Sequence, residues 1–271
     1  AGLFGLPDGY GVLLGNGGAT LFWDAATFGL IERRSQHLSF GEFSSKFGQA
    51  ADAAPHLESP QIIRAEPGDH PLPVRDSGID AYALTQNETS TGVAMPIARP
   101  AKADGLVLVD ATSAAGGIRV DPAEFDVYYF SPQKCFAADG GLWLAACSPA
   151  AQERITKIAG SGRWIPAGLD LATAMDNSLK NQTYNTPALA TLIMLADQLD
   201  WMNGQGGLEF AAGRSDRSAQ TLYSWAEAAD YATPFVSDPA KRSPVVGTID
   251  RDDRVDATVV SSILRTHGIV D

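Results

Sequence analysis

Two residues of opposite charge follow apolar segments of this chain and are the first candidates for chemistry. Asp110 ends the apolar run 106–109, and Lys134 follows the run 127–130 after a short polar loop. Such runs are typical of buried strands. The carboxyl ends of parallel strands meet at one edge of a sheet, where α/β proteins bind their ligands. The spacing therefore predicts that both side chains reach one ligand.

Each of these residue types has a distinct use at such a site. In a cleft, a partly desolvated lysine amine has a lowered pKa and becomes a nucleophile toward an aldehyde. A carboxylate can accept a hydrogen bond from a protonated heteroaromatic nitrogen, as an Asp does beside the ring of pyridoxal phosphate. The alternatives are a solvated surface lysine at 134 and an Asp110 that caps the turn before Thr112.

A glycine-rich turn is a third candidate. The apolar run 10–15 leads into Asn16, Gly17 and Gly18, and apolar residues recur at helical spacing over 19–32. The unpaired N–H groups and the dipole of a helix N-terminus favour an anion such as a phosphate. An ordinary strand-to-helix turn is the alternative, because a glycine-rich turn alone is a weak signal.

The elements that would position these residues alternate along the first part of the chain. Further apolar runs predict strands at 61–64, 79–84 and 142–146, with helical stretches or loops between several of them. This alternation predicts an α/β fold with a largely parallel sheet. Proline and glycine over 66–77 predict a surface loop.

After Pro149 the pattern becomes helical, most clearly over 150–159, 187–203 and 208–229, and Pro187 suits a first helical turn. A strand is predicted at 245–249 and a helix at 256–265. We expect a large cofactor-binding domain over 1–200 and the incomplete start of a small domain over 201–271. The chain has no initiator Met and stops just after a predicted helix, so both ends look truncated.

The bulk composition excludes several classes of partner. A net charge of −12 argues against a general nucleic-acid binder, which needs clustered Lys and Arg. The two cysteines and four histidines lack metal-ligand spacing, and no apolar run approaches the roughly 18 residues that cross a bilayer. We expect a cytoplasmic protein with reduced cysteines and no metal, nucleic-acid or membrane partner.

Several motifs in the right order resemble the cofactor site of the phosphoserine aminotransferases, most closely the actinobacterial type. The motifs lie at residues 15–20, 41–43, 87–89, 109–113, 131–134, 139–143 and 181–187, so they cover nearly the whole chain. The family belongs to the class-V, fold-type-I enzymes that depend on pyridoxal phosphate. The resemblance implies an α/β fold with a mainly parallel sheet of the seven-stranded type flanked by helices, plus part of a small C-terminal domain.

The resemblance also implies a role for each matching residue. Lys134 would bind the cofactor covalently and, once displaced by substrate, move a proton between the substrate α-carbon and the cofactor. Asp110 would pair with the pyridine nitrogen. Other implied contacts are Gly18, Ala19 and Gln133 to the cofactor phosphate, Phe43 to the ring in place of the Trp of many relatives, Thr89 near the phenolic oxygen, and Asn185 and Thr186 to the phosphate of the neighbouring subunit in a homodimer.

Each of these contacts has a structural alternative. Phe43 could be an ordinary core aromatic, because that is the commoner place for a Phe in an amphipathic segment. Thr89 and Gln133 could belong to plain turns or caps. Asn185 and Thr186 could cap the helix before Pro187, and Thr186 could serve both purposes.

The implied reaction transfers an amino group between O-phospho-L-serine and 2-oxoglutarate, giving 3-phosphooxypyruvate and L-glutamate in serine biosynthesis, with a related substrate in pyridoxine biosynthesis. One rival is another fold-type-I enzyme, an alanine-glyoxylate-type aminotransferase or a cysteine desulfurase. Another is a noncatalytic α/β binding protein. The family's substrate-gripping basic residues near both ends are missing from this sequence. We therefore expect cofactor binding with poor turnover.

Overall fold

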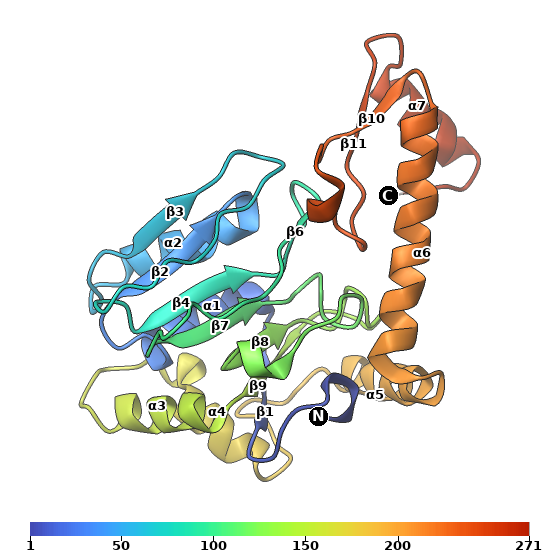
Figure 1. Ribbon diagram of the computed structural model, residues 1–271. Helices are drawn as coiled ribbons and strands as arrows, with labels where there is room; N and C mark the ends of the chain where they lie inside the picture. The colour runs from blue at the N-terminus through green and yellow to red at the C-terminus, as the bar shows by residue number, and fades with distance from the viewer. Residues whose placement is uncertain (271) are drawn as a thin grey trace.

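A seven-stranded sheet forms the centre of the computed structural model, which describes residues 1–270 (Figure 1). Asp271, the last residue of the expected small domain, lies outside the described residues. The strand order is β1-β9-β8-β7-β4-β2-β3. Only β9 runs antiparallel to its neighbours, so the expected mainly parallel α/β sheet is confirmed. The strands are β1 Gly11–Asn16, β2 Ser35–Ser39, β3 Gln61–Arg64, β4 Ala81–Thr85, β7 Leu106–Asp110, β8 Val127–Phe130 and β9 Leu142–Cys147.

The two faces of the sheet carry two separate apolar clusters because successive strand residues point to opposite sides. Tyr128 packs in one cluster with Phe130 and with Leu195 of α5, whereas Tyr129 packs in the other with Phe22 and Phe47. The strands are buried on both faces, as parallel strands usually are. Four helices contribute side chains to the cluster that contains Tyr129. They are α1 Ala19–Gly29, α2 Glu42–Ala53, α3 Pro149–Ala159 and α4 Leu171–Ser178.

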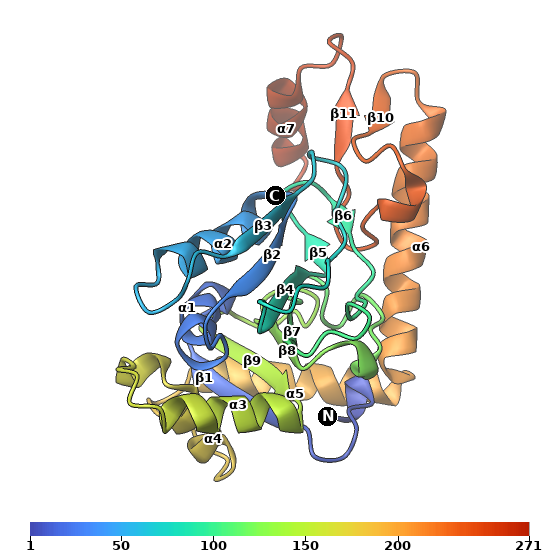
Figure 2. The same ribbon diagram turned by 60° about the vertical axis from the view of Figure 1, so that its left-hand side comes forward.

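The C-terminal part extends away from the sheet along one long helix. Helix α5 (Leu189–Gly204) leads into α6 (Gly207–Ala228), which runs past the sheet to the antiparallel pair β10 (Ala232–Pro234) and β11 (Ile249–Arg251) and to α7 (Ala257–Thr266) (Figure 2). The segment between β10 and β11 contacts a separate hairpin that follows β4 and is formed by β5 (Asn87–Glu88) and β6 (Val93–Ala94). There Ser243 N donates to Gly92 O at 2.9 Å, and Thr248 Oγ1 donates to Thr91 O at 2.9 Å.

Most predicted elements are present, with corrections at four places. The buried strand β2 was not predicted, because its sequence Ser-Gln-His-Leu-Ser has no apolar run. The strand predicted at 245–249 is wrong, since β11 begins only at Ile249, where β10 provides a pairing partner. Helix α5 begins at Leu189 with Ala188 as its N-cap, so Pro187 precedes the helix and does not lie in its first turn. Helix α1 ends at Gly29, short of the predicted residue 32.

Within the part of the chain that the structure describes, no helix combines the length and the apolar character needed to span a bilayer.

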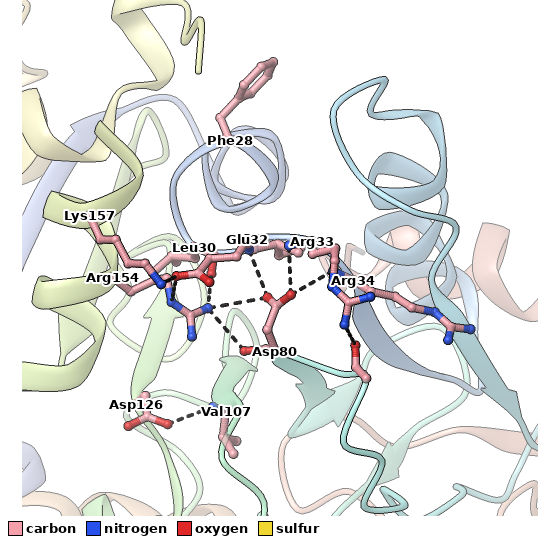
Figure 3. A network of polar contacts seen from close by, with 12 residues as sticks. Phe28, Leu30, Glu32, Arg33, Arg34, Asp80, Val107, Asp126, Arg154 and Lys157 are labelled. Atoms are coloured by element: carbon pink, nitrogen blue, oxygen red, sulfur yellow. Dashed lines mark hydrogen bonds and ion pairs between the residues drawn. The ribbon is translucent and has the colours of Figure 1, made fainter. Parts of the chain in front are cut away.

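A polar network around Asp80 locks the edge of the sheet where the parallel strands begin (Figure 3). One carboxylate oxygen of Asp80 accepts from the backbone N–H groups of Arg33 and Arg34, both at 2.8 Å. The other accepts from Glu32 N at 2.9 Å and faces Arg154 Nη1 at 3.4 Å. The Arg154 guanidinium also contacts Glu32 Oε1 at 3.0 Å. A single side chain therefore joins the end of α1, the start of β2 and helix α3.

Replacing Asp80 by Asn should destabilise the fold, because an NH2 group would then face backbone donors. We expect Asp80→Asn to lower the unfolding free energy by about 2 kcal/mol, within the range for hydrogen bonds to a charged group. Urea denaturation measures it. Asp121→Asn is the control, because Asp121 makes an exposed cap bond to Ala123 N at 2.9 Å, and it should cost clearly less. Equal losses of unfolding free energy in the two variants would contradict the structural role given to Asp80.

Candidate active site

Asp110 is the most deeply placed of the predicted site residues. It ends β7, is 6% exposed, and accepts at Oδ1 from Thr112 N at 2.9 Å and from Thr112 Oγ1 at 2.6 Å. Its Oδ2 accepts from Trp23 Nε1 of α1 at 2.9 Å. The turn cap that was the alternative for Asp110 is therefore present. This cap uses only Oδ1 of Asp110, whereas Oδ2 faces Trp23 of α1.

The electrostatics of Asp110 suit a cationic partner. Burial raises the pKa of this carboxyl, and the hydrogen bonds from Thr112 and Trp23 oppose that rise only in part. All three groups that donate to it at these distances are neutral. A buried carboxylate that is held only by neutral donors is stabilised further when a cation binds beside it.

The segment around Thr89 lies against the loop that follows Asp110. Thr89 Oγ1 and Asn87 Nδ2 both donate to Ser113 Oγ, each at 2.9 Å. Cys135 Sγ donates to Ser113 O at 3.4 Å, which brings the residue next to Lys134 to the same place. Ser113 thus connects the loops that follow three successive strands of the sheet. It was not among the predicted residues, although its position inside the motif at 109–113 was a usable signal.

Lys134 lies in the turn after β8, the parallel neighbour of β7, so it is at the same edge of the sheet as Asp110. Its side chain is exposed, and it is not enclosed in the cleft that the sequence reasoning supposed. Ala137 N donates to Lys134 O at 2.9 Å, which closes the turn. Gln133 is also exposed in this turn. Lys134 therefore lies at the predicted edge of the sheet, but the described residues do not shield its amine from solvent.

The glycine-rich turn approaches the same edge from β1. Gly17 has φ of +108°, a conformation that favours glycine, and its N–H donates to Gly141 O at 2.9 Å in the loop after Lys134. Gly18 is the N-cap of α1 and has no side chain to cap it. The first N–H groups of a helix have no partner inside the helix, so those of Gly18 and Ala19 are available to an anion.

Phe43 is positioned at the start of α2. Its side chain is 36% exposed, so the alternative of an ordinary core aromatic is wrong. Lys46 Nζ lies 5.4 Å from the centre of its ring. One turn further along α2, Phe47 stacks on Trp23, the donor to Asp110, with ring centres 6.3 Å apart. Trp23 was not predicted, because its place in the apolar pattern of α1 gave it the appearance of a core residue.

Asn185 and Thr186 lie on the surface beside the glycine-rich turn of their own chain. Both are exposed, and Asn16 Nδ2 donates to Thr186 O at 2.8 Å. Thr186 does not cap α5, whose N-cap is Ala188, so the capping alternative is wrong. Thr186 and Pro187 line a cavity of about 700 Å³ with Leu14 of β1.

The residues at this edge fit bound pyridoxal phosphate. Asp110 offers a buried carboxylate to the cationic ring nitrogen, and the uncapped start of α1 offers N–H groups to the phosphate. Lys134 offers an exposed amine at the same edge. A seven-stranded α/β sheet with this constellation is typical of enzymes that depend on pyridoxal phosphate. The family model for class-V aminotransferases matches residues 75–270, which places the chain in that class.

Comparison with known proteins narrows the class. The chain is 62% identical over 274 residues to the phosphoserine aminotransferase of a Nocardioides species, covering 100% of this chain and 73% of that protein. The chain belongs to the phosphoserine aminotransferase family of class V. Its fold matches the crystal structure of a phosphoserine aminotransferase from Cytophaga hutchinsonii with a TM-score of 0.90 at 22% identity, covering 99% of this chain and 75% of that one. A PLP-bound phosphoserine aminotransferase from Trichomonas vaginalis matches with a TM-score of 0.80 at 17% identity, covering 100% and 76%.

Proposed function

We propose that this aminotransferase transfers an amino group between O-phospho-L-serine and 2-oxoglutarate, producing 3-phosphooxypyruvate and L-glutamate, in the biosynthesis of L-serine. The observation that carries the proposal is the 62% identity, over the whole chain, to a protein named phosphoserine aminotransferase. A phosphorylated amino acid of pyridoxine biosynthesis is the second donor that we propose.

The roles that we propose for the residues are those implied by the family resemblance. When bound, pyridoxal phosphate supplies an electron sink that makes the α-proton of the amino acid removable. Lys134 would hold the cofactor through its amine and then carry that proton, because a lysine amine can act both as nucleophile and as general base. Asp110 would keep the ring nitrogen protonated. Gly18, Ala19 and Gln133 would bind the phosphate.

Phe43 and Thr89 complete the proposed ring contacts. Phe43 would lie against the ring from α2, and the hydroxyl of Thr89 would lie on the phenolic oxygen side. The exposure of the Phe43 ring supports its role, since an exposed aromatic surface next to a polar site is available to a flat ligand. The contact of Thr89 with Ser113 supports its role, because it sets the hydroxyl in the loop beside Asp110.

We also propose a homodimer in which Asn185 and Thr186 reach the cofactor phosphate of the neighbouring subunit. An apolar surface around these residues supports it: Tyr184 is 55% exposed, Leu189 64% and Ile193 69%. Leu189 and Ile193 are one turn apart on α5, and exposed apolar side chains that gather in this way are typical of a surface that another protein covers. The cavity of about 700 Å³ beside β1 belongs to the same surface.

The cysteine desulfurase alternative is not favoured by the geometry. Such an enzyme needs a thiolate on a mobile loop that reaches the substrate sulfur. Cys135 is the cysteine next to Lys134, but its thiol donates to Ser113 O, and burial raises its pKa. The thiol is therefore harder to deprotonate than an ordinary cysteine, which does not favour a nucleophilic role.

Comparing amino donors tests the substrate assignment. With 2-oxoglutarate as acceptor, we expect kcat/KM for O-phospho-L-serine to exceed that for L-serine by roughly 10²-fold or more, because a site built for a polar group rejects a substrate that lacks it. L-Serine is the matched control, since it differs only in the phosphate. A preference for L-alanine with glyoxylate would favour the alanine-glyoxylate alternative instead.

A further inference from the structure

Glu88 is a fully buried carboxylate next to the site, with no role assigned so far. It is 0% exposed and accepts from Ser44 N at 2.8 Å and from Phe43 N at 3.3 Å, both in the first turn of α2. Ser90 adds its hydroxyl at 2.7 Å and its N–H at 3.2 Å. These four donors are neutral, so the carboxylate is stabilised by backbone and hydroxyl dipoles.

Helix α2 receives its N-terminal cap from this distant segment. Its own N-cap, Gly41, has no side chain, and a Cβ there would lie 2.3 Å from Glu88 Cγ. Ser90 Oγ accepts from Glu42 N at 2.9 Å, so Glu88 and Ser90 together satisfy the N–H groups of residues 42–44. A carboxylate at this end of a helix is also favoured by the helix dipole. The start of α1, by contrast, has no side-chain cap.

The residues on either side of Glu88 connect this cap to the candidate site. Asn87 and Thr89 both donate to Ser113 Oγ, in the loop after Asp110. The helix that Glu88 caps carries Phe43 and, one turn later, Phe47 against Trp23. The carboxylate therefore connects the backbone of Phe43 to the segment that carries Thr89, and these two residues are 46 positions apart in the sequence.

We propose that Glu88 is a positioning residue for the cofactor, which sets the distance between Phe43 and Thr89 by holding the first turn of α2. The inference rests on the proposed function, because it takes Phe43 and Thr89 as cofactor contacts. Glu88 would not touch the cofactor. It would raise the affinity for the cofactor through Phe43 and Thr89. The start of α2 would otherwise be free to move away from Thr89.

Glu88→Gln tests the proposal, because it keeps the size of the side chain and places an NH2 group against backbone donors. We expect the Kd for pyridoxal phosphate, measured by absorption titration, to rise roughly tenfold, the effect of weakening one buried hydrogen bond to a charged group. Ser148→Ala is the matched control. Ser148 caps α3 by accepting from Ala151 N at 3.2 Å and lies next to Asp126, at the opposite edge of the sheet. It should lower Tm and leave the Kd unchanged.

A second variant and a labelling experiment separate failure of the positioning role from failure of the proposed function. If Glu88→Gln does not fold, Ser90→Ala decides, because it removes only the hydroxyl contacts and should raise the Kd by roughly threefold. Borohydride labelling of the unchanged protein is run in parallel. A label on Lys134 together with an unchanged Kd in the Glu88 and Ser90 variants would overturn the positioning role and leave the proposed function intact. No label on Lys134 in the unchanged protein would overturn both.

Discussion

Replacing Lys134 by Ala is expected to abolish covalent capture of pyridoxal phosphate and to reduce amino transfer by at least about 10³-fold, within the range for loss of a general acid–base group. The reason is that the variant loses both the amine that attaches the cofactor and the base that carries the α-proton. Borohydride reduction followed by peptide mapping measures the first effect, and single-turnover amino transfer measures the second. Lys134→Arg should behave in the same way, because a guanidinium keeps the charge and is not a nucleophile at neutral pH.

Lys157→Ala is the control for this experiment. Lys157 is an exposed lysine of α3 that pairs with Glu32 at 2.6 Å, in the network of Figure 3 and away from the candidate site. It should retain both the label on Lys134 and the activity. If Lys134→Ala bound and released a phosphorylated ligand normally, the noncatalytic binding-protein alternative would be favoured. A label on another lysine in the unchanged protein would refute the assignment of Lys134.

Replacing Asp110 by Asn is expected to slow amino transfer by roughly 10²- to 10³-fold, the usual effect of removing one electrostatic stabiliser of a transition state. The cofactor should still be labelled at Lys134, because the attachment chemistry is intact. Without the carboxylate, the ring nitrogen loses the partner that keeps it protonated. Single-turnover rates and the visible spectrum of the cofactor-bound protein before borohydride reduction measure the effect.

Thermal stability gives a second test of Asp110, because burial raises the pKa of this carboxyl in the protein without cofactor. A raised pKa means that the folded state holds the proton more tightly than the unfolded state. The charged carboxylate therefore costs stability as the pH rises above its ordinary value of 3.8. A bound cation removes part of that cost. We therefore expect pyridoxal phosphate to raise the Tm of the unchanged protein by more than that of Asp110→Asn.

Asp126→Asn is the matched control for Asp110, because Asp126 is a buried Asp at the opposite edge of the sheet. It accepts from Val107 N at 2.8 Å and pairs with Arg99 at 2.8 Å. Its loss should lower Tm and leave the spectrum of the bound cofactor unchanged. An Asp110→Asn protein with an unaltered rate and an unaltered cofactor-induced gain in Tm would show that Asp110 serves only as the cap of its turn.

Local patterns in the sequence were enough to predict the main elements of the site. The apolar runs before Asp110 and Lys134 predict two strands, and the structure has them as neighbouring parallel strands. The glycines before Ala19 predict the start of α1, and the helix begins there. These predictions succeed because strand runs, glycine turns and helix starts depend on residues close together in the chain.

Other features depend on contacts between distant segments and were decided only by the tertiary structure. Strand β2 is polar in sequence and is a strand because β3 and β4 pair with it on both sides. Trp23 looks like a core residue until the fold places its Nε1 against Asp110. Glu88 looks like part of a turn until α2 places its first N–H groups around the carboxylate. A hydrogen bond across 44 or 87 positions leaves no periodic signal in the sequence, so its partners are known only once the chain has folded.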